Sequence, residues 1–204
     1  CIIKINNYGM NNDELFKIQS NTLNPRIGDI LLSEPFMNDY YFRRSAILII
    51  DHNDEGSLGV IINKRLSIPF NEIVQGFPKF DADVYLGGPV ETDRLFFIHT
   101  IGEMIPDSTK IISGLYWSGN VNALKAMIKN DLIKPHEVRF FVGYAGWDGG
   151  QLRNELKANT WIAGHFSTKQ ILQTIPGKMW SDFTKEMGKR YSLWSKFPVN
   201  PSDN

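Results

Sequence analysis

The apolar residues of this chain fall into short β-type runs, separated by turn residues and by segments with helical spacing. Ser45 to Ile50 is one such run, too short for a helix and typical of a strand covered on both faces. A second run, Leu58 to Asn63, follows the polar stretch 51–56, so the pair predicts a hairpin with a polar tip. No run approaches the roughly 18 residues of a membrane span. The pattern therefore predicts strands mixed with helices and no transmembrane segment.

The rest of the chain continues this alternation. Further strands are predicted at 29–33, 84–86, 95–99, 110–112, 138–144 and 161–163, and helices at 70–77, 120–130 and 149–159. Interleaved strands and helices that include a hairpin favour an α/β or α+β domain with a mixed sheet and helices outside it. We expect this domain to span residues 28–165. A loosely ordered arm over 1–27 would precede it, and a C-terminal helical extension and tail over 166–204 would follow.

Composition limits the classes of partner. The 204 residues carry 22 basic and 22 acidic side chains, which argues against a surface that binds nucleic acid or anionic lipid everywhere. The first hundred residues hold 9 basic and 13 acidic side chains, and the remainder holds 13 and 9. Cys1 is the only cysteine, so no internal disulfide forms and a cytoplasmic location is expected. We interpret residues 1–9 as lying before a native start at Met10.

The sequence lacks the common metal-binding, nucleophile and phosphate-binding motifs. The stretch 51–56 begins like a calcium-binding EF-hand loop, but the twelfth position, which needs a bidentate Glu, is Ile62. The four histidines are isolated and no internal cysteine accompanies them, so no zinc site is predicted. Neither a nucleophile elbow nor a phosphate-binding P-loop motif is present. The sequence predicts no metal and no cofactor, and it leans against an enzyme.

A polar rim is one candidate binding site. A predicted strand enters the glycine-rich segment Gly143–Gly150 and a helix follows, an arrangement that offers free backbone N–H groups to an anion. In this interpretation Arg44 binds the anion and His52 or His99 is the group that titrates. Alternatively, each residue has a structural role, as an ion pair, a turn cap or a tight bend. The ligand-binding candidates are Arg44, Ser45, His52, Asn63, Gly87, Gly88, Pro89, His99, Tyr144, Gly146, Trp147 and Gln151.

The C-terminal segment is a second candidate. Trp180, Phe183, Met187, Tyr191 and Trp194 recur at steps of three and four, which places them on one stripe of a helix. A basic amphipathic helix of this kind can lie on a membrane, bind nucleic acid or bury its stripe on its own domain, and the last is commonest. The candidates for contact with nucleic acid or a protein partner are Lys178, Trp180, Lys185, Lys189, Arg190 and Trp194.

Several motifs in a fixed order resemble the AlgH/YqgE family of small bacterial proteins. They are Gly28-Asp29-Ile30-Leu31-Leu32, Asp39-x-x-Phe42-x-Arg44-Ser45, His52-x3-Gly56-x2-Gly59-x3-Asn63, Gly87-Gly88-Pro89-Val90, Phe97-x-His99 and Gly143-Tyr144-Ala145-Gly146-Trp147 with Gln151, Leu152, Glu155 and Trp161. The resemblance implies a bifurcated sheet curled into a pseudo-barrel with surrounding helices. The family name implies transcriptional regulation of exopolysaccharide, without an established biochemical activity.

Three functions remain open from the sequence. The first is a non-enzymatic regulatory or binding protein, a transcriptional regulator by family name, that binds nucleic acid or a protein through the C-terminal basic-aromatic helix. The second is a small-molecule or anion-binding protein, or an enzyme, that uses a polar rim around Arg44, His52, His99 and Gly143–Gly150. This second hypothesis requires those residues to converge in space. The third is a scaffold that docks another subunit through an aromatic surface. We favour the first, because it needs no catalytic geometry.

Overall fold

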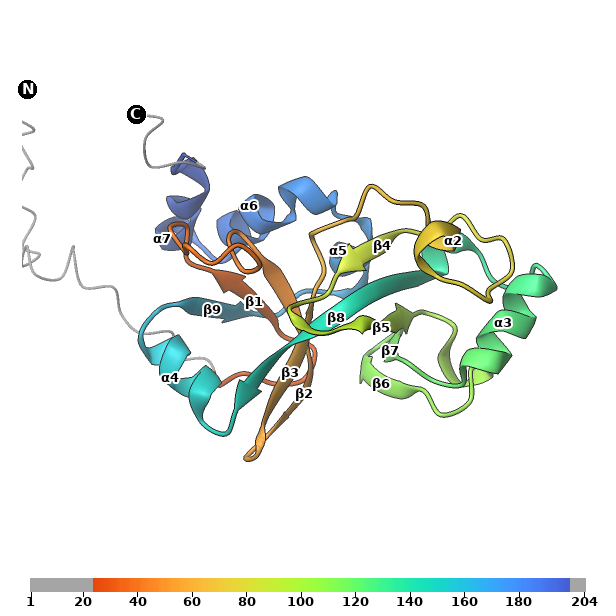
Figure 1. Cartoon of the computed structure of the whole chain (residues 1–204). Coiled ribbons are helices and arrows are strands. Elements are labelled where there is room, and N and C mark those ends of the chain that lie inside the picture. Colours follow the sequence, from red (N-terminus) through yellow and green to blue (C-terminus); the bar gives the residue numbers. More distant parts are fainter. Residues whose placement is uncertain (1–23, 199–204) are drawn as a thin grey trace, which may run out of the picture.

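A long strand, β8 (Val138–Asp148), organises the computed structural model, which describes residues 24–198 (Figure 1). The other strands are β1 (Ile30–Ser33), β2 (Ala46–Asn53), β3 (Gly56–Ile61), β4 (Val84–Leu86), β5 (Val90–His99), β6 (Thr109–Ile112), β7 (Leu115–Trp117) and β9 (Trp161–Gly164). The helices are α2 (Phe70–Ile73), α3 (Val121–Lys129), α4 (Gln151–Lys157), α5 (Thr168–Gln173), α6 (Pro176–Glu186) and α7 (Lys189–Ser192), with 3-10 turns at Gly102–Met104, Pro135–Glu137 and Trp194–Lys196.

The sheet divides in two along β8. The strand order is β6-β7-β5-β8-β3-β2-β1-β9, and β4 also pairs with β8. Residues 140–142 of β8 pair with β4 in parallel, and residues 145–148 pair with β3 in the antiparallel sense. On its other edge, β8 pairs with β5 only as far as Tyr144. The neighbour of β8 therefore changes midway along the strand, which produces a bifurcated sheet.

Glycines permit the close approach at this division. Gly143 has a φ of 70°, in the left-handed region that favours glycine. A Cβ atom on Gly87 would overlap the carbonyl oxygen of Gly143, and one on Gly88 would overlap the backbone of Tyr144. The Gly87 N–H donates to the carbonyl of Val142 at 2.8 Å. These glycines are therefore explained by backbone packing.

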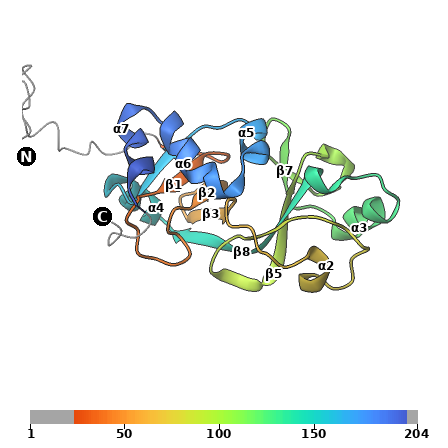
Figure 2. The ribbon, with the colours of Figure 1, turned by 90° about the horizontal axis from the view of Figure 1, so that it is seen from above.

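Three apolar clusters cover the faces of the two half-sheets. The main cluster joins β1, β2 and β3 to Met179, Trp180 and Phe183 of α6, all three of which are buried. A second cluster packs α2 and α3 against β8 around Phe70 and Phe140. A third packs α4 around Trp147 and Trp161, on the face of β1 and β2 opposite the main cluster. Figure 2 shows α2 and α3 at one end of the sheet and α4 at the other. Helices from three parts of the chain thus enclose the sheet, and the C-terminal helix α6 shares the core of the N-terminal strands.

The predicted α/β class is confirmed. The sheet is mixed and bifurcated, as the resemblance implied, but it is open: within residues 24–198 no pairing joins the end strands β6 and β9, so no barrel closes. The predicted hairpin is confirmed, with Asn53 opposite Gly56 at its tip. Strand β8 extends four residues beyond its predicted end at Tyr144, so most of the expected glycine loop is strand.

Parts of the predicted domain plan lie outside the described residues. Of the arm expected over 1–27, the first 23 residues are not described, and neither are residues 199–204 of the tail. In the described part of the chain, no helix is both long enough and apolar enough to cross a lipid bilayer.

Candidate functional site

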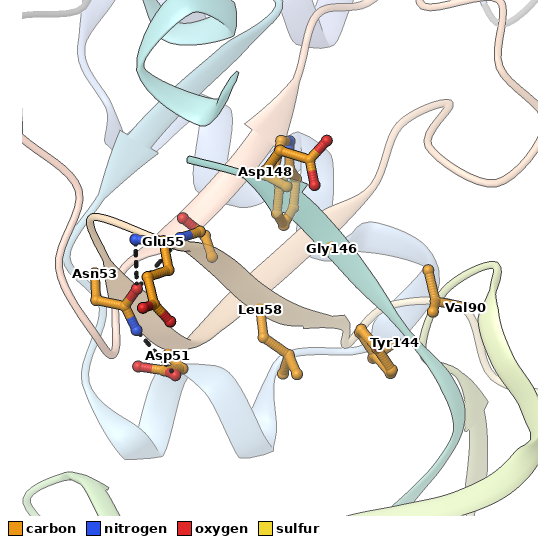
Figure 3. A pocket seen from close by; sticks show the side chains of 11 residues that line it. Asp51, Asn53, Glu55, Leu58, Val90, Tyr144, Gly146 and Asp148 are labelled. Carbon is orange, nitrogen blue, oxygen red and sulfur yellow. Dashed lines mark hydrogen bonds between the residues drawn. The ribbon is translucent and has the colours of Figure 1, made fainter. Parts of the chain in front are cut away.

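A groove lies where the protruding hairpin of β2 and β3 runs beside the end of β8 (Figure 3). Strand register places Asp51, Leu58 and Gly146 in one row across the three strands. Asn53, Gly56 and Asp148 form the next row on the same face. Two of these six positions, Gly56 and Gly146, are glycine, so no side chain covers the sheet there beside Leu58. The hollow has a volume of ≈ 460 Å³, within the ~300–1,000 Å³ range of ligand pockets.

The groove has an apolar wall and an acidic rim. Leu58 and Tyr144 project to the same side of β3 and β8 (Figure 3), and Val90 stands beside them on β5. Among the described residues, the charged side chains that line the groove are all acidic and exposed: Asp51, Glu55 and Asp148. The groove therefore combines an apolar contact surface with a negative potential.

Asn53 shapes the hairpin tip from which this rim extends. Its side-chain oxygen accepts hydrogen bonds from the backbone N–H groups of Glu55 at 2.8 Å and Gly56 at 3.2 Å. This is the local side-chain-to-backbone pattern by which Asn stabilises tight turns. Asn53 thereby fixes where Glu55 stands relative to the groove.

Behind the groove, one carboxylate ties β8 to its covering helix. Oε2 of Glu155 accepts hydrogen bonds from the indole N–H of Trp147 at 2.8 Å and of Trp161 at 2.7 Å. Oε1 accepts from the side-chain amide of Gln151 at 2.8 Å. Both indoles are buried. These contacts assign Trp147 and Gln151 to the attachment of α4 on the far face of β8.

His52 lies on that opposite face of the hairpin. Its Nδ1 is 2.7 Å from the hydroxyl oxygen of Ser57. It borders a second, separate hollow of ≈ 360 Å³, which Gly150 and Arg153 also line. Of the candidates for the polar rim, His52, Tyr144, Gly146, Trp147 and Gln151 thus gather around the hairpin, although on two different faces.

Arg44, Ser45 and Asn63 lie together at the other end of β2, where they form a junction. The Asn63 side chain accepts from the N–H of Ala46 and donates to the carbonyl of Arg44, both at 2.9 Å. The Ser45 hydroxyl donates to the carbonyl of Tyr41 at 2.9 Å. These bonds fix the entry of the chain into β2.

The Arg44 guanidinium is directed toward the C-terminal segment. It lies 4.8 Å from the centre of the Trp180 ring and donates to the carbonyls of Phe197 at 2.6 Å and Pro198 at 2.8 Å. Burial, and then the neighbouring charge of Arg43, lowers the pKa of Arg44 from its ordinary value. Arg44 therefore joins the start of β2 to the end of the described chain.

His99 is remote from the hairpin and buried. Its Nε2 lies 2.9 Å from the Ser108 hydroxyl and 3.0 Å from the carbonyl of Ser118. Burial lowers its pKa below the usual value. His99 pairs with Val138, eight residues from Gly146 along β8, which is roughly 25 Å at strand spacing. The structure does not bring Arg44, His52 and His99 to one rim, and Gly87-Gly88-Pro89 sits at the division of the sheet.

The C-terminal candidates divide between core and surface. Trp180 is buried, and its indole N–H donates to the carbonyl of Ser33 at 3.0 Å. Trp194 is half-buried and lies edge-on to Tyr191. The basic side chains, Lys178, Lys185, Lys189 and Arg190, are exposed, and Lys185 forms an ion pair with Asp182 at 3.2 Å. The aromatic stripe thus packs on the domain, as its commonest interpretation predicted, and the charges face outward.

Sequence reasoning missed most of the groove. The sequence predicts the polar hairpin tip but does not identify as binding residues Asp51, Glu55, Leu58, Val90 and Asp148. The signal that identifies them is the cross-strand register, which no pattern along a single strand reveals. Within residues 24–198 no three His, Cys, Asp or Glu side chains come together as metal ligands would.

Comparison with known proteins supplies the family. Residues 30–192 match the family model described as AlgH-like. A UPF0301 protein of Parabacteroides distasonis is 42% identical over 189 residues, 92% of this chain and 96% of its own. One from Bacteroides fragilis is 42% identical over 194 residues, 95% and 98% of the two chains.

Solved structures agree with this fold. A crystal structure of a Corynebacterium diphtheriae protein superposes with a TM-score of 0.71 at 24% identity, covering 86% of this chain and 94% of its own. The solution structure of the AlgH protein from Pseudomonas aeruginosa gives 0.66 at 26% identity, covering 84% and 93%. The chain therefore belongs to the AlgH-like family of UPF0301 proteins.

Proposed function

We propose that this protein is a non-enzymatic regulatory protein that acts by binding a protein partner in the groove between the β2–β3 hairpin and β8. The observation that carries the proposal is the groove itself, a glycine-floored hollow of ≈ 460 Å³ on a protruding hairpin. Apolar surface beside a charged rim is the arrangement of a protein-docking site, where apolar contact supplies affinity and charge supplies specificity.

The floor of the groove offers a direct way to test this function. Among the described residues, a Cβ atom on Gly146 would meet only the Tyr144 ring edge, at 3.5 Å, an ordinary van der Waals distance. The Cβ atom added by Gly146→Val therefore meets no backbone atom of the described residues, its two methyl groups add bulk on the groove floor, and Val is favoured in strands. Gly177, which has open space around its Cβ position, provides a matched control as Gly177→Ala.

The experiment places a photoreactive amino acid at Val90, on the groove wall, in cells that express the full chain. We expect a crosslinked adduct of discrete mass that disappears in the Gly146→Val background and persists in the Gly177→Ala background. A photoreactive residue at Leu132, which is 64% exposed and lies outside the groove, should give no such adduct. Equal crosslinking from Val90 with and without the Gly146 substitution would exclude the groove as the binding site.

A second candidate function is contact with an anionic partner, including nucleic acid, through the outer face of α6 and α7. The observation that favours it is the exposure of Lys178, Lys189 and Arg190, while the aromatic stripe packs on the domain through the buried side chains of Trp180 and Phe183. Fluorescence anisotropy of labelled duplex DNA and RNA across a salt series tests it, because each phosphate contact steepens the salt dependence. Binding that Lys178→Ala and Lys189→Ala together leave unchanged would remove this face from consideration.

A further inference from the structure

Among the described residues 24–198, no strand pairs with the outer edge of β8 beyond Tyr144, so the end of β8 is an open strand edge. Residues 145–148 pair with β3 on one side, whereas β5 pairs with β8 no further than Tyr144. The N–H of Asp148 donates to the side chain of Gln151 at 2.9 Å, so it points away from β3. Because residues two apart in a strand point their peptide groups the same way, the N–H and C=O of Gly146 face this open edge. Unpaired edge groups of this kind are a template for an added strand.

The residues that line the groove determine which side chains an added strand could carry next to β8. A residue paired with Gly146 would direct its side chain over the glycine, onto Leu58 and Tyr144. An apolar side chain suits that position, because no cross-strand side chain on Gly146 excludes it. An apolar residue of the partner is therefore favoured at the position paired with Gly146.

The next position on the same face of an added strand is two residues away, beside Asp148. Glu55, which stands beside Asn53 and Asp51 at the hairpin tip (Figure 3), adds a further negative charge to the same groove. Opposite charges on directly paired strand positions stabilise the pairing, and like charges oppose it. A Lys or Arg side chain is therefore favoured at this position and an acidic side chain is excluded.

We infer that the occupant of the groove is an extended segment of a protein partner in which an apolar and a basic residue stand two positions apart, added as a strand along β8 at Gly146. The inference rests on the proposed function and specifies the chemistry of its partner. Backbone hydrogen bonds to Gly146 supply the register, the apolar residue packs on Leu58 and Tyr144, and the basic residue meets Asp148.

The probe is a fluorescein-labelled octapeptide with Thr-Leu-Thr-Lys repeated twice, measured by fluorescence polarisation against the full chain. Three matched peptides accompany it: one with Glu in place of Lys, one with Ser in place of Leu, and one N-methylated at alternate residues. We expect the Leu/Lys peptide to bind at least about tenfold more tightly than each of them, because each change removes one of the three contacts.

Protein variants separate the groove from general charge attraction. Gly146→Val keeps every acidic side chain, and we expect it to weaken binding of the Leu/Lys peptide about tenfold. If Gly146→Val does not fold, Gly146→Ala provides a smaller substitution at the same position, for which we expect a smaller loss of affinity. Asp148→Asn should weaken it about threefold and flatten the salt dependence, and Gly177→Ala should leave it unchanged. Binding that Gly146→Val leaves intact, or equal binding of the Glu or N-methylated peptide, overturns the inference. If crosslinking from Val90 persists while the Leu/Lys peptide fails to bind, the groove function stands and only this partner chemistry falls.

Discussion

Replacement of Glu155 by Ala tests how the far side of the groove is held. The carboxylate accepts hydrogen bonds from two buried indoles, those of Trp147 and Trp161, which are 6% and 2% exposed. Truncation leaves both N–H donors without a partner. An unsatisfied buried donor costs about 1–3 kcal/mol, so the two together predict a loss of about 4 kcal/mol in the free energy of unfolding. That is a large share of the ~5–15 kcal/mol that stabilises a typical domain.

Urea denaturation, followed by tryptophan fluorescence and far-ultraviolet circular dichroism, measures the loss. Glu155→Gln retains one acceptor oxygen, so we expect a loss of about half that size. Glu103→Ala, at an exposed position, is the matched control and should stay within about 0.5 kcal/mol of the wild type. A loss below about 1 kcal/mol for Glu155→Ala, with an unchanged denaturant slope, would refute the role assigned to this carboxylate.

Three further predictions concern the core and the division of the sheet. Phe183→Ala should lower the free energy of unfolding by about 3–5 kcal/mol in urea denaturation, because Phe183 is fully buried in the main core and stacks on Phe166; a loss under 1 kcal/mol would show that α6 is not part of that core. Gly87→Ala should reduce the melting temperature sharply or abolish soluble expression, because its Cβ would overlap the carbonyl of Gly143; a wild-type melting curve would contradict the geometry at the division. Burial lowers the pKa of His99 in the folded chain from its usual 6.5. The contribution of His99 to stability is therefore complete above pH 6.5 and is lost as the pH falls below that value, so His99→Gln should flatten the decline of stability below pH 6.5 in urea denaturation; an unchanged slope would place the acid sensitivity elsewhere.

Much of the fold is readable from local patterns. The apolar runs at 45–50 and 58–63 with a polar tip predict the hairpin, and the structure confirms it. Helical spacing at 120–130 likewise predicts α3 (Val121–Lys129). These elements are predictable because hydrophobic periodicity and turn chemistry are properties of adjacent residues.

The division of the sheet at β8 is harder to predict from the sequence. A glycine-rich sequence suggests a loop, yet both glycines lie inside strand β8. Gly143 has a left-handed backbone conformation there, and Gly146 leaves a position without a side chain. What decides between loop and strand is the neighbour across the sheet, here β3, which lies some ninety residues earlier in the chain. The candidate site has the same origin, because Asp51, Leu58 and Gly146 become one row only through strand register.

In the C-terminal segment, the aromatic residues and the basic residues lie on different faces of the same helices. A basic helix with an aromatic stripe can lie on a membrane, bind nucleic acid or pack on its own domain, and here Trp180 and Phe183 lie in the core. The exposed cations on α6 and α7 follow from helix geometry once that face is fixed. Deletion of this segment would therefore remove core residues as well as charge, so point substitutions such as Lys178→Ala are the cleaner probe of the surface.

The most direct test of the central claim is quantitative affinity purification of the full chain from cells, comparing the wild type, Gly146→Val and Gly177→Ala at equal expression. The groove account predicts that the proteins recovered with the wild type are also recovered with Gly177→Ala and are depleted about tenfold with Gly146→Val, while both variants keep the wild-type melting temperature. Recovery of the same proteins in the same amounts with Gly146→Val would show that the protein binds its partners elsewhere.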